Sequence, residues 1–278
     1  MTMARLAGWA LVMATSVGLG ACATGEAGSA NRFDEAAVAA DHRVASEAGA
    51  QILRQGGNAV DAAVATSFVL SVVRPESCGI GGGGFMVIHF SEGGQRQMEA
   101  RGLWPAGQKR DVALNYREMA PGAVGPDYFE ALPADASVFG GKAVGVPGTV
   151  AGLLFALERY GTLSRATVLA PAIRAAEKGF AVDAHYAKSV KDLQTKFEKE
   201  PAARDAYRFV WERFLKEGSV KVGDRITLPE QAAALRLISE RGAAAFYDGP
   251  IAEAVLEAVA RAGGAMNAED LKGFKVAA

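Results

Sequence analysis

A glycine-rich segment is the first place in this sequence where residue types and spacing suggest chemistry. Residues 79–84 hold five glycines in six positions and satisfy the pattern G-x-G-x-x-G. In a dinucleotide site a strand precedes that pattern and a helix follows it, so that the helix N-terminus faces the pyrophosphate. Here a helical pattern precedes the glycines and an apolar strand pattern follows them. This order argues against a phosphate site and favours a tight, structured turn between two core elements.

Cys78, directly before the glycines, is a candidate nucleophile, but it needs a base within reach. The three histidines, His42, His89 and His185, are scattered along the chain without a recognisable motif. We therefore favour the interpretation of Cys78 as a small buried residue beside a tight turn. His42 and His89 are interpreted as core or surface histidines rather than as catalysts.

The sequence also lacks the patterns of common metal and nucleotide sites. It contains neither CxxC nor HExxH, and Cys78 is the single cysteine after position 22. An internal disulfide and a zinc site are therefore not expected. Gly141-Lys142 is followed by Ala143 and lacks the upstream glycine of a Walker A motif. We expect no metal and no cofactor.

Arg117 is the stronger candidate for a binding residue. It follows the strand predicted over residues 112–116 and precedes Ala120-Pro121. A guanidinium group presents a rigid fork of N–H donors that fits a carboxylate. The spacing is equally compatible with a structural ion pair between Arg117 and Glu118, so both interpretations stay open.

Two helices are predicted before the glycines. Residues 46–55 have helix-forming composition, and Gly56-Gly57 stops them as a C-terminal cap. Asn58 and Asp61 have the spacing of a capping box at the start of the next helix. Residues 59–72 are apolar almost all round, which predicts a buried helix.

After the glycines, residues 85–90 predict a buried strand, residues 92–94 a turn, and residues 112–116 the partner strand. The segment 95–111 shows no clean periodicity. The rest of the chain is predicted to be helical over residues 149–160, 164–178 (interrupted by Pro171), 184–199, 203–217, 229–241, 250–262 and a short stretch after Asn267.

Composition limits the possible function classes. The chain has 278 residues, half of them apolar, with a formal net charge of −1. This length is ample for a packed core. The near-neutral charge argues against a nucleic-acid-binding protein.

The N-terminus has the features of an export signal. Residues 1–21 combine Arg5, an apolar run and small residues at its end, and Cys22 follows. The sequence Leu-Gly-Ala-Cys at 19–22 resembles the bacterial lipobox, so we expect a lipoprotein-type signal peptide, lipidation of Cys22 and a flexible tether over residues 22–33. An ordinary signal peptide is the alternative. Since Ala23 rather than an acidic residue stands directly after Cys22, we expect an exported periplasmic protein anchored by lipid to the outer membrane.

Several segments resemble the gamma-glutamyltransferase (gamma-glutamyl transpeptidase) family and occur in that family's order. They are residues 45–49, 56–65, 75–85, 116–121, 144–152, 169–173, 245–249 and 269–271. The resemblance implies an α+β, N-terminal-nucleophile hydrolase fold with αββα layers, incomplete in this chain. Residues 34–278 would form a large-subunit portion.

The resemblance also implies an activity. Such a precursor cleaves itself, and the Thr that then begins the small subunit attacks gamma-glutamyl amides such as glutathione, passing the acyl group to water or an amino acid. By motif position, Arg117 matches the arginine that holds the substrate's α-carboxylate. We expect the Thr beyond Ala278, so no catalytic residue is assigned here, and the fragment alone is expected to be inactive without the small subunit from the same precursor.

This sequence departs from the family pattern in three places. Met119 replaces the usual Thr, Cys78 replaces a common Ser, and residues 95–111 look like an insertion near the predicted site. Two alternatives therefore stay open: a related amide hydrolase such as a cephalosporin acylase, and a non-catalytic binding lipoprotein on the same fold.

Overall fold

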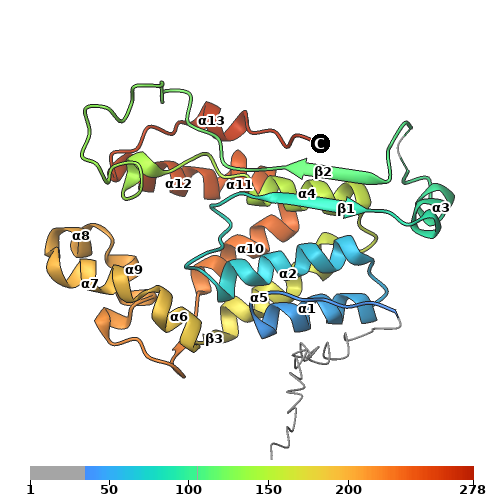
Figure 1. The fold of residues 1–278 in the computed structure, drawn as a ribbon, viewed down its shortest axis with the longest axis horizontal. Helices are drawn as coiled ribbons and strands as arrows, with labels where there is room; N and C mark the ends of the chain where they lie inside the picture. The colour runs from blue at the N-terminus through green and yellow to red at the C-terminus, as the bar shows by residue number, and fades with distance from the viewer. Residues whose placement is uncertain (1–34, 105) are drawn as a thin grey trace, which may run out of the picture. The chain divides into compact units, whose positions relative to one another are not determined.

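Two neighbouring helices carry the first part of the core in the computed structural model, which describes residues 35–104 and 106–278 (Figure 1). In α1 (Arg43–Arg54) the His42 ring accepts a hydrogen bond from the backbone N–H of Val44. In α2 (Ala59–Val73) the predicted capping box is complete. The predicted signal peptide and tether, residues 1–33, lie outside the described residues.

The prediction that α2 is buried is confirmed. It packs against α1, α4 (Thr149–Tyr160) and α5 (Arg165–Lys178), and α10 (Pro229–Arg241) covers the other side of α5. Asp61 is fully buried, and its carboxylate also accepts hydrogen bonds from the backbone N–H groups of Thr162 and Leu163. The cap of α2 therefore also binds the α4–α5 connection, which locks these helices together.

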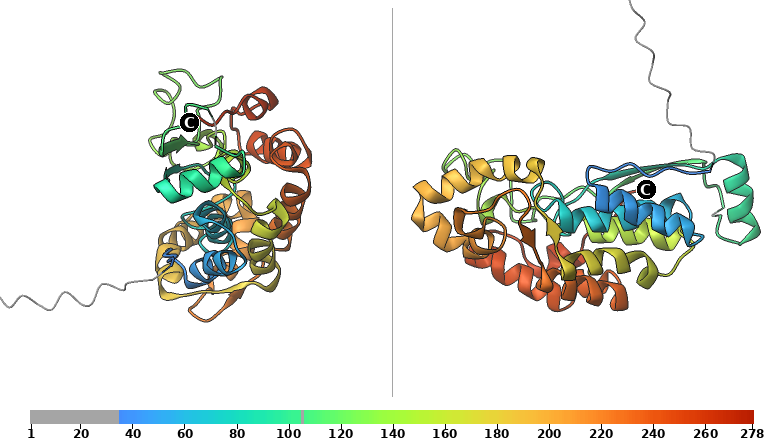
Figure 2. Two further views of the ribbon diagram at one scale, coloured as in Figure 1. Left: turned by 90° about the vertical axis from the view of Figure 1, so that its right-hand side faces the viewer. Right: turned by 90° about the horizontal axis from the view of Figure 1, so that it is seen from below.

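The two predicted strands form an antiparallel hairpin. β1 (Phe85–His89) pairs with β2 (Asp111–Asn115), with Phe85 opposite Asn115 and His89 opposite Asp111. The hairpin runs alongside α4 (Figures 1 and 2). The prediction that β1 is buried is wrong, because Phe85 and Val87 are 61% and 79% exposed. Strand side chains alternate between two faces, and only one face of this two-stranded sheet packs on the core.

The segment between the strands contains a helix that the sequence did not predict. α3 (Glu92–Ala100) begins where Ser91 Oγ accepts a hydrogen bond from the N–H of Gly94, so the turn predicted at residues 92–94 is wrong. The glycines masked its helical propensity. His89 and Asp111 pair at one end of the hairpin, and α3 lies at that end (Figure 1). Arg117 follows the opposite end, about 16 Å away for a five-residue strand. The expectation that this insertion lies near the site is therefore wrong.

The remaining elements are short. Residues 184–217 break into several pieces instead of two helices, because Val190 ends one helix and Pro201 begins another. The elements are β3 (Phe180–Ala181) paired with β4 (Arg225–Ile226), α6 (Ala184–Ser189), α7 (Lys191–Lys199), α8 (Pro201–Ala206), α9 (Arg208–Arg213), η2 (Lys216–Gly218), α11 (Ala244–Tyr247), α12 (Pro250–Arg261) and α13 (Ala268–Lys272), with η1 (Gly141–Ala143) before α4. None of the helices in the described part is long and apolar enough to cross a membrane.

Candidate substrate-binding site

The glycine-rich segment is hydrogen-bonded on both sides. The N–H of Gly84 donates to the carbonyl of Tyr116 at 3.3 Å, and the N–H of Tyr116 donates back to Gly84 at 3.0 Å. The carbonyl of Gly82 accepts from the N–H groups of Gly148 and Thr149, at 2.8 and 2.9 Å. The first N–H groups of a helix have no partner within the helix. The glycine segment therefore binds both the end of β2 and the start of α4.

Glycine is required where these three segments meet. A Cβ on Gly83 would lie 2.6 Å from the backbone nitrogen of Glu118 and 2.7 Å from the carbonyl oxygen of Tyr116. Cβ atoms on Gly148 and Gly152 would lie 1.9 and 2.0 Å from atoms of Tyr116. The predicted tight turn between a helix and a strand is therefore confirmed, and close backbone approach explains its glycines.

This junction fixes the position of Arg117. Its backbone N–H donates to Asn115 Oδ1 at 3.0 Å, while its side chain is 68% exposed. Arg117 Nε lies 3.9 Å from Glu118 Oε2, which is the long limit of an ion pair. An exposed pair of this length contributes little to stability. The ion pair with Glu118 exists, but it leaves most of the guanidinium donors available for a ligand.

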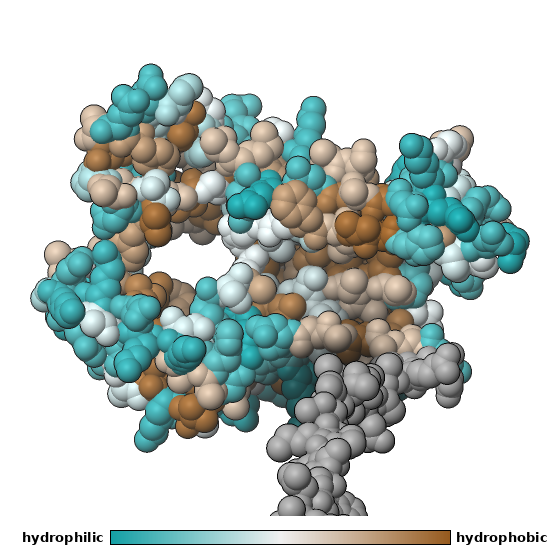
Figure 3. Space-filling model, viewed as in Figure 1, coloured by the Kyte–Doolittle hydropathy of each residue, from teal (hydrophilic) through white to brown (hydrophobic). Residues whose placement is uncertain are grey.

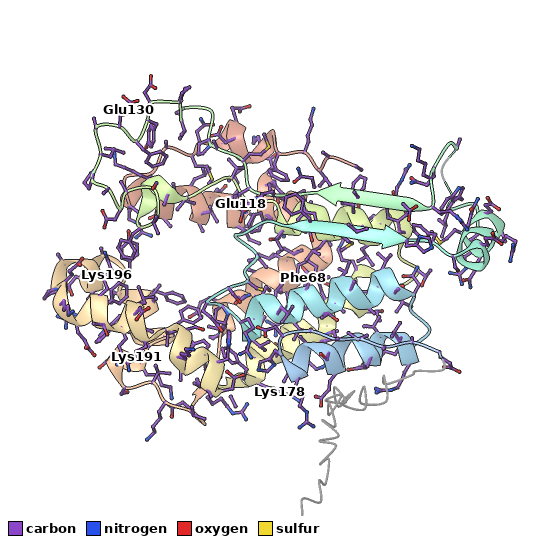
Figure 4. The ribbon with its side chains drawn as sticks, viewed as in Figure 1. Phe68, Glu118, Glu130, Lys178, Lys191 and Lys196 are labelled. Atoms are coloured by element: carbon purple, nitrogen blue, oxygen red, sulfur yellow. The ribbon has the colours of Figure 1, made fainter. Side chains whose placement is uncertain are left out.

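Arg117 and Glu118 line a cleft of about 580 Å³. An antiparallel bridge between Met119 and Val146, with N–H to oxygen distances of 3.2 and 2.7 Å, connects the two ends of the loop that forms its walls. Figure 3 shows a hollow in this part of the surface, and Figure 4 shows Glu118 at its edge. The lining residues are Gly81, 117–121, Val124, Phe129, Ser137 and 142–145.

Glu118 is a site residue that the sequence analysis considered only as a partner of Arg117. Its side chain lies against the glycine segment, and it borders both the main cleft and a second pocket of about 200 Å³. An arginine and a glutamate side by side present opposite charges to one cleft. Such an arrangement complements a ligand that carries both a carboxylate and an ammonium group. The sequence signal that could have identified Glu118 as a site residue is its position directly after Arg117.

Cys78 is exposed, so the interpretation of a buried residue is wrong. Its backbone N–H donates to the carbonyl of Arg74 at 2.8 Å, and this turn at the end of α2 directs Cys78 into the second pocket. The histidines have other roles. His42 caps α1, His89 Nδ1 lies 2.6 Å from Asp111 Oδ1, and His185 Nε2 lies 3.9 Å from Glu76 Oε1. Among the described residues, no contact supplies Cys78 with a histidine base.

A cluster of charged residues anchors the start of the glycine segment. The buried Arg74 side chain donates to Asp183 Oδ2 at 2.6 Å and to Asp41 Oδ2 at 3.1 Å. The hydrogen bond from Arg74 lowers the pKa of Asp183 to about 2. Burial raises the pKa of Glu76, whose carboxylate oxygens lack hydrogen-bond partners among the described residues. Within residues 35–278, apart from position 105, no group of three metal-ligating side chains comes together.

Comparison with known proteins agrees with this geometry. The profile described as Gamma-glutamyltranspeptidase matches residues 45–278. The glutathione hydrolase proenzyme of Bacillus subtilis (strain 168) is 38% identical over 245 residues, which cover 86% of this chain and 38% of that protein. The acylase ACY 1 proenzyme of Pseudomonas sp. (strain V22) is 34% identical over 250 residues, covering 86% of this chain and 41% of that protein.

A solved structure extends the match to three dimensions. The crystal structure of Helicobacter pylori gamma-glutamyltranspeptidase superposes with a TM-score of 0.75 at 34% identity, over 88% of this chain and 66% of that chain. Of the two curated relatives named above, the chain spans well under half the length. It has the α+β, N-terminal-nucleophile hydrolase fold of these structural neighbours. The chain belongs to the gamma-glutamyltranspeptidase family.

Proposed function

We propose that this chain supplies part of the donor site of an enzyme for gamma-glutamyl transfer or hydrolysis. The observation that carries the proposal is the position of Arg117, at the end of β2 with an exposed guanidinium in the main cleft beside Glu118. Arg117 would hold the α-carboxylate of the gamma-glutamyl group, and Glu118 would face its α-ammonium group. A hydrogen bond to a charged group contributes about 1.5–3 kcal/mol, enough to orient a small donor.

In this proposal the covalent chemistry belongs to the Thr that begins the small subunit. In the proposed reaction, the hydroxyl of the small subunit's N-terminal Thr attacks the gamma-glutamyl carbonyl, and its own amine accepts the proton. The amide C–N bond breaks, and the leaving amine takes that proton. Water or an amino acid then attacks the resulting ester and releases the Thr. The residues described here would bind and orient the donor for both steps.

The proposed partner is a small subunit from the same precursor, and the exposed face of β1 supports this. Phe85 and Val87 on β1 and Met119 beyond β2 are exposed apolar side chains. The pairing of Asn115 with Ala277 places the end of the chain next to β2. A covering layer over this apolar sheet face would remove it from water, which is favourable by about 25 cal/mol per Å².

The test uses the full-length precursor and its Arg117→Ala and Arg117→Lys variants. Wild-type protein is expected to mature into two chains and to release p-nitroaniline from a gamma-glutamyl anilide. Arg117→Ala should mature normally and lose mainly donor affinity, with KM raised about 10-fold or more, since 1.4 kcal/mol corresponds to a factor of ten. Arg117→Lys should recover part of that loss, because it keeps the charge but not the fork of donors. Unchanged kinetics in Arg117→Ala would overturn the assigned role.

A related amide hydrolase is the second candidate, and the similarity to the acylase ACY 1 proenzyme supports it. Glutathione and a glutaryl amide differ in the α-ammonium group that Glu118 would face. Parallel assays with both donors distinguish the candidates, because only the gamma-glutamyl enzyme should need that group. A non-catalytic binding lipoprotein would lack the Thr at the processing junction, which the downstream reading frame would reveal.

We also propose export and lipid anchoring, on the sequence of residues 1–33 alone. The lipobox-like segment ending at Cys22 supports a lipidated N-terminus on the periplasmic side of the outer membrane. Metabolic labelling with palmitate should mark the wild-type protein, and Cys22→Ser should abolish the label. Labelling that persists in Cys22→Ser would contradict the proposal.

A further inference from the structure

A second cation lines the cleft that contains Arg117. Lys142 lies in η1 and borders the same space, and its side chain is exposed. Among the described residues that line the cleft, Glu118 is the only acidic one, and it already lies beside Arg117. Lys142 forms no ion pair with any residue in the described part of the chain. The cleft therefore presents one positive charge that no carboxylate of the described residues offsets by an ion pair.

The backbone that carries Lys142 is firmly held. Gly140 has a φ of 97°, in the region that favours glycine, and its carbonyl accepts from the N–H of Ala143. Gly141 packs so closely on the C-terminal end of α12 that a Cβ there would lie 2.5 Å from the carbonyl oxygen of Ala262. The Lys142 ammonium group lies 5.9 Å from the centroid of the Tyr128 ring, within cation–π range. These contacts fix the backbone from which the Lys142 side chain extends, and the Tyr128 ring is a neighbour of its ammonium group.

The cleft has room for more than a gamma-glutamyl group. Its volume of about 580 Å³ falls within the range of about 300–1,000 Å³ found for sites that enclose whole small molecules. A donor whose α-carboxylate binds Arg117 would leave space for its leaving group. Lysine is a compact point charge with rotatable donors, so it suits a carboxylate whose orientation is not fixed.

We propose that Lys142 binds an anionic group on the leaving-group side of the donor. The inference rests on the proposed function and assigns a specificity-determining residue to that site, because Lys142 would favour gamma-glutamyl compounds whose leaving amine carries a carboxylate. Glutathione, which ends in the carboxylate of glycine, has this form. Lys142 would act before the leaving group departs, and therefore in formation of the acyl-enzyme rather than in its hydrolysis.

The experiment measures kcat/KM for glutathione and for its glycine ethyl ester, by glutamate release, with the processed full-length enzyme. The two donors differ in the charge that Lys142 would contact. The variants are Lys142→Met, which removes the charge, and Lys142→Arg, which keeps it. Lys178→Met is the control, because Lys178 is an exposed lysine at the end of α5 that does not line the cleft (Figure 4).

Wild-type enzyme is expected to prefer glutathione over the ester, and Lys142→Met should reduce that preference about fivefold or more, as expected for a partly exposed charge contact. Lys142→Arg and Lys178→Met should keep the preference. An equal preference in wild type and Lys142→Met, or equal rates for both donors in wild type, would overturn the inference while leaving the proposed function in place. If wild type matures but hydrolyses neither donor, the proposed function itself fails, and the inference with it.

Discussion

Replacing Gly83 by alanine should damage the junction that positions Arg117, whereas the same change at Gly82 should not. A Cβ on Gly83 would lie 2.6 and 2.7 Å from two backbone atoms of the segment after β2. An ordinary carbon contact is about 3.5–4.0 Å, so that segment would have to move by close to 1 Å. The paired hydrogen bonds between Gly84 and Tyr116 oppose that movement. A Cβ on Gly82 would meet nothing closer than 3.5 Å.

The expected cost follows from these contacts. Overpacking costs about 1–3 kcal/mol, and weakening the hydrogen bonds between Gly84 and Tyr116 adds about 1 kcal/mol. Gly83→Ala should therefore lower the free energy of unfolding by about 2–4 kcal/mol. Gly82→Ala should change it by less than about 1 kcal/mol, since alanine also restricts the unfolded chain. The sequence alone did not distinguish these two glycines.

The assay compares the thermal midpoints of the two variants in the full-length precursor and the fraction of each that matures into two chains. Gly83→Ala should melt at least about 4 °C below wild type and mature poorly, and Gly82→Ala should match wild type in both measurements. Equal midpoints and equal maturation in the two variants would refute the argument that close backbone approach at Gly83 fixes this junction. A loss in Gly82→Ala alone would refute it as well.

Two further predictions use other parts of the structure. Arg74 lowers the pKa of Asp183 from 3.8 to about 2, so the stability that this pair contributes is present above pH 3.8 and is lost as the pH falls toward 2. Asp183→Asn should therefore lower the urea midpoint at neutral pH, and its urea midpoint should decline less steeply than that of wild type between pH 3.8 and 2. A decline as steep as that of wild type would contradict the assignment. α3 lies at the end of the hairpin away from Arg117, and salt at physiological concentration screens charges over about 8 Å. The charge reversals Arg96→Glu and Glu99→Lys should therefore leave KM for a gamma-glutamyl anilide within about twofold of wild type. A larger change would show that α3 reaches the site.

Local sequence signals were sufficient for much of the framework. The capping box of Asn58 and Asp61 was predicted from spacing, and the two strands after the glycines were predicted from their short apolar runs, because caps and strand patterns depend on residues a few positions apart. α3 was missed because its glycines gave it the composition of a turn. The split of residues 184–217 was missed because helical periodicity continues across the breaks.

The candidate site was only partly predictable. Arg117 could be named from its place after a strand and from the resemblance, and the structure places its side chain in the main cleft. Lys142 could not be recognised as a residue of the same cleft, because it reaches the cleft from a separate part of the loop that leads to α4. Cys78 was wrongly interpreted as buried, since a position beside a tight turn does not determine which side of that turn faces a pocket.

By itself, the sequence determined the family, the positions of the long core helices and of β1 and β2, and the presence of a tight glycine turn before β1, because these depend on motifs and periodicities within short stretches. Only the tertiary structure decided which groups act together. Arg74 and Asp183 pair across 109 positions, and Gly82 binds the start of α4 far along the chain. Such contacts depend on how the packed helices bring distant segments together, and no local pattern encodes them.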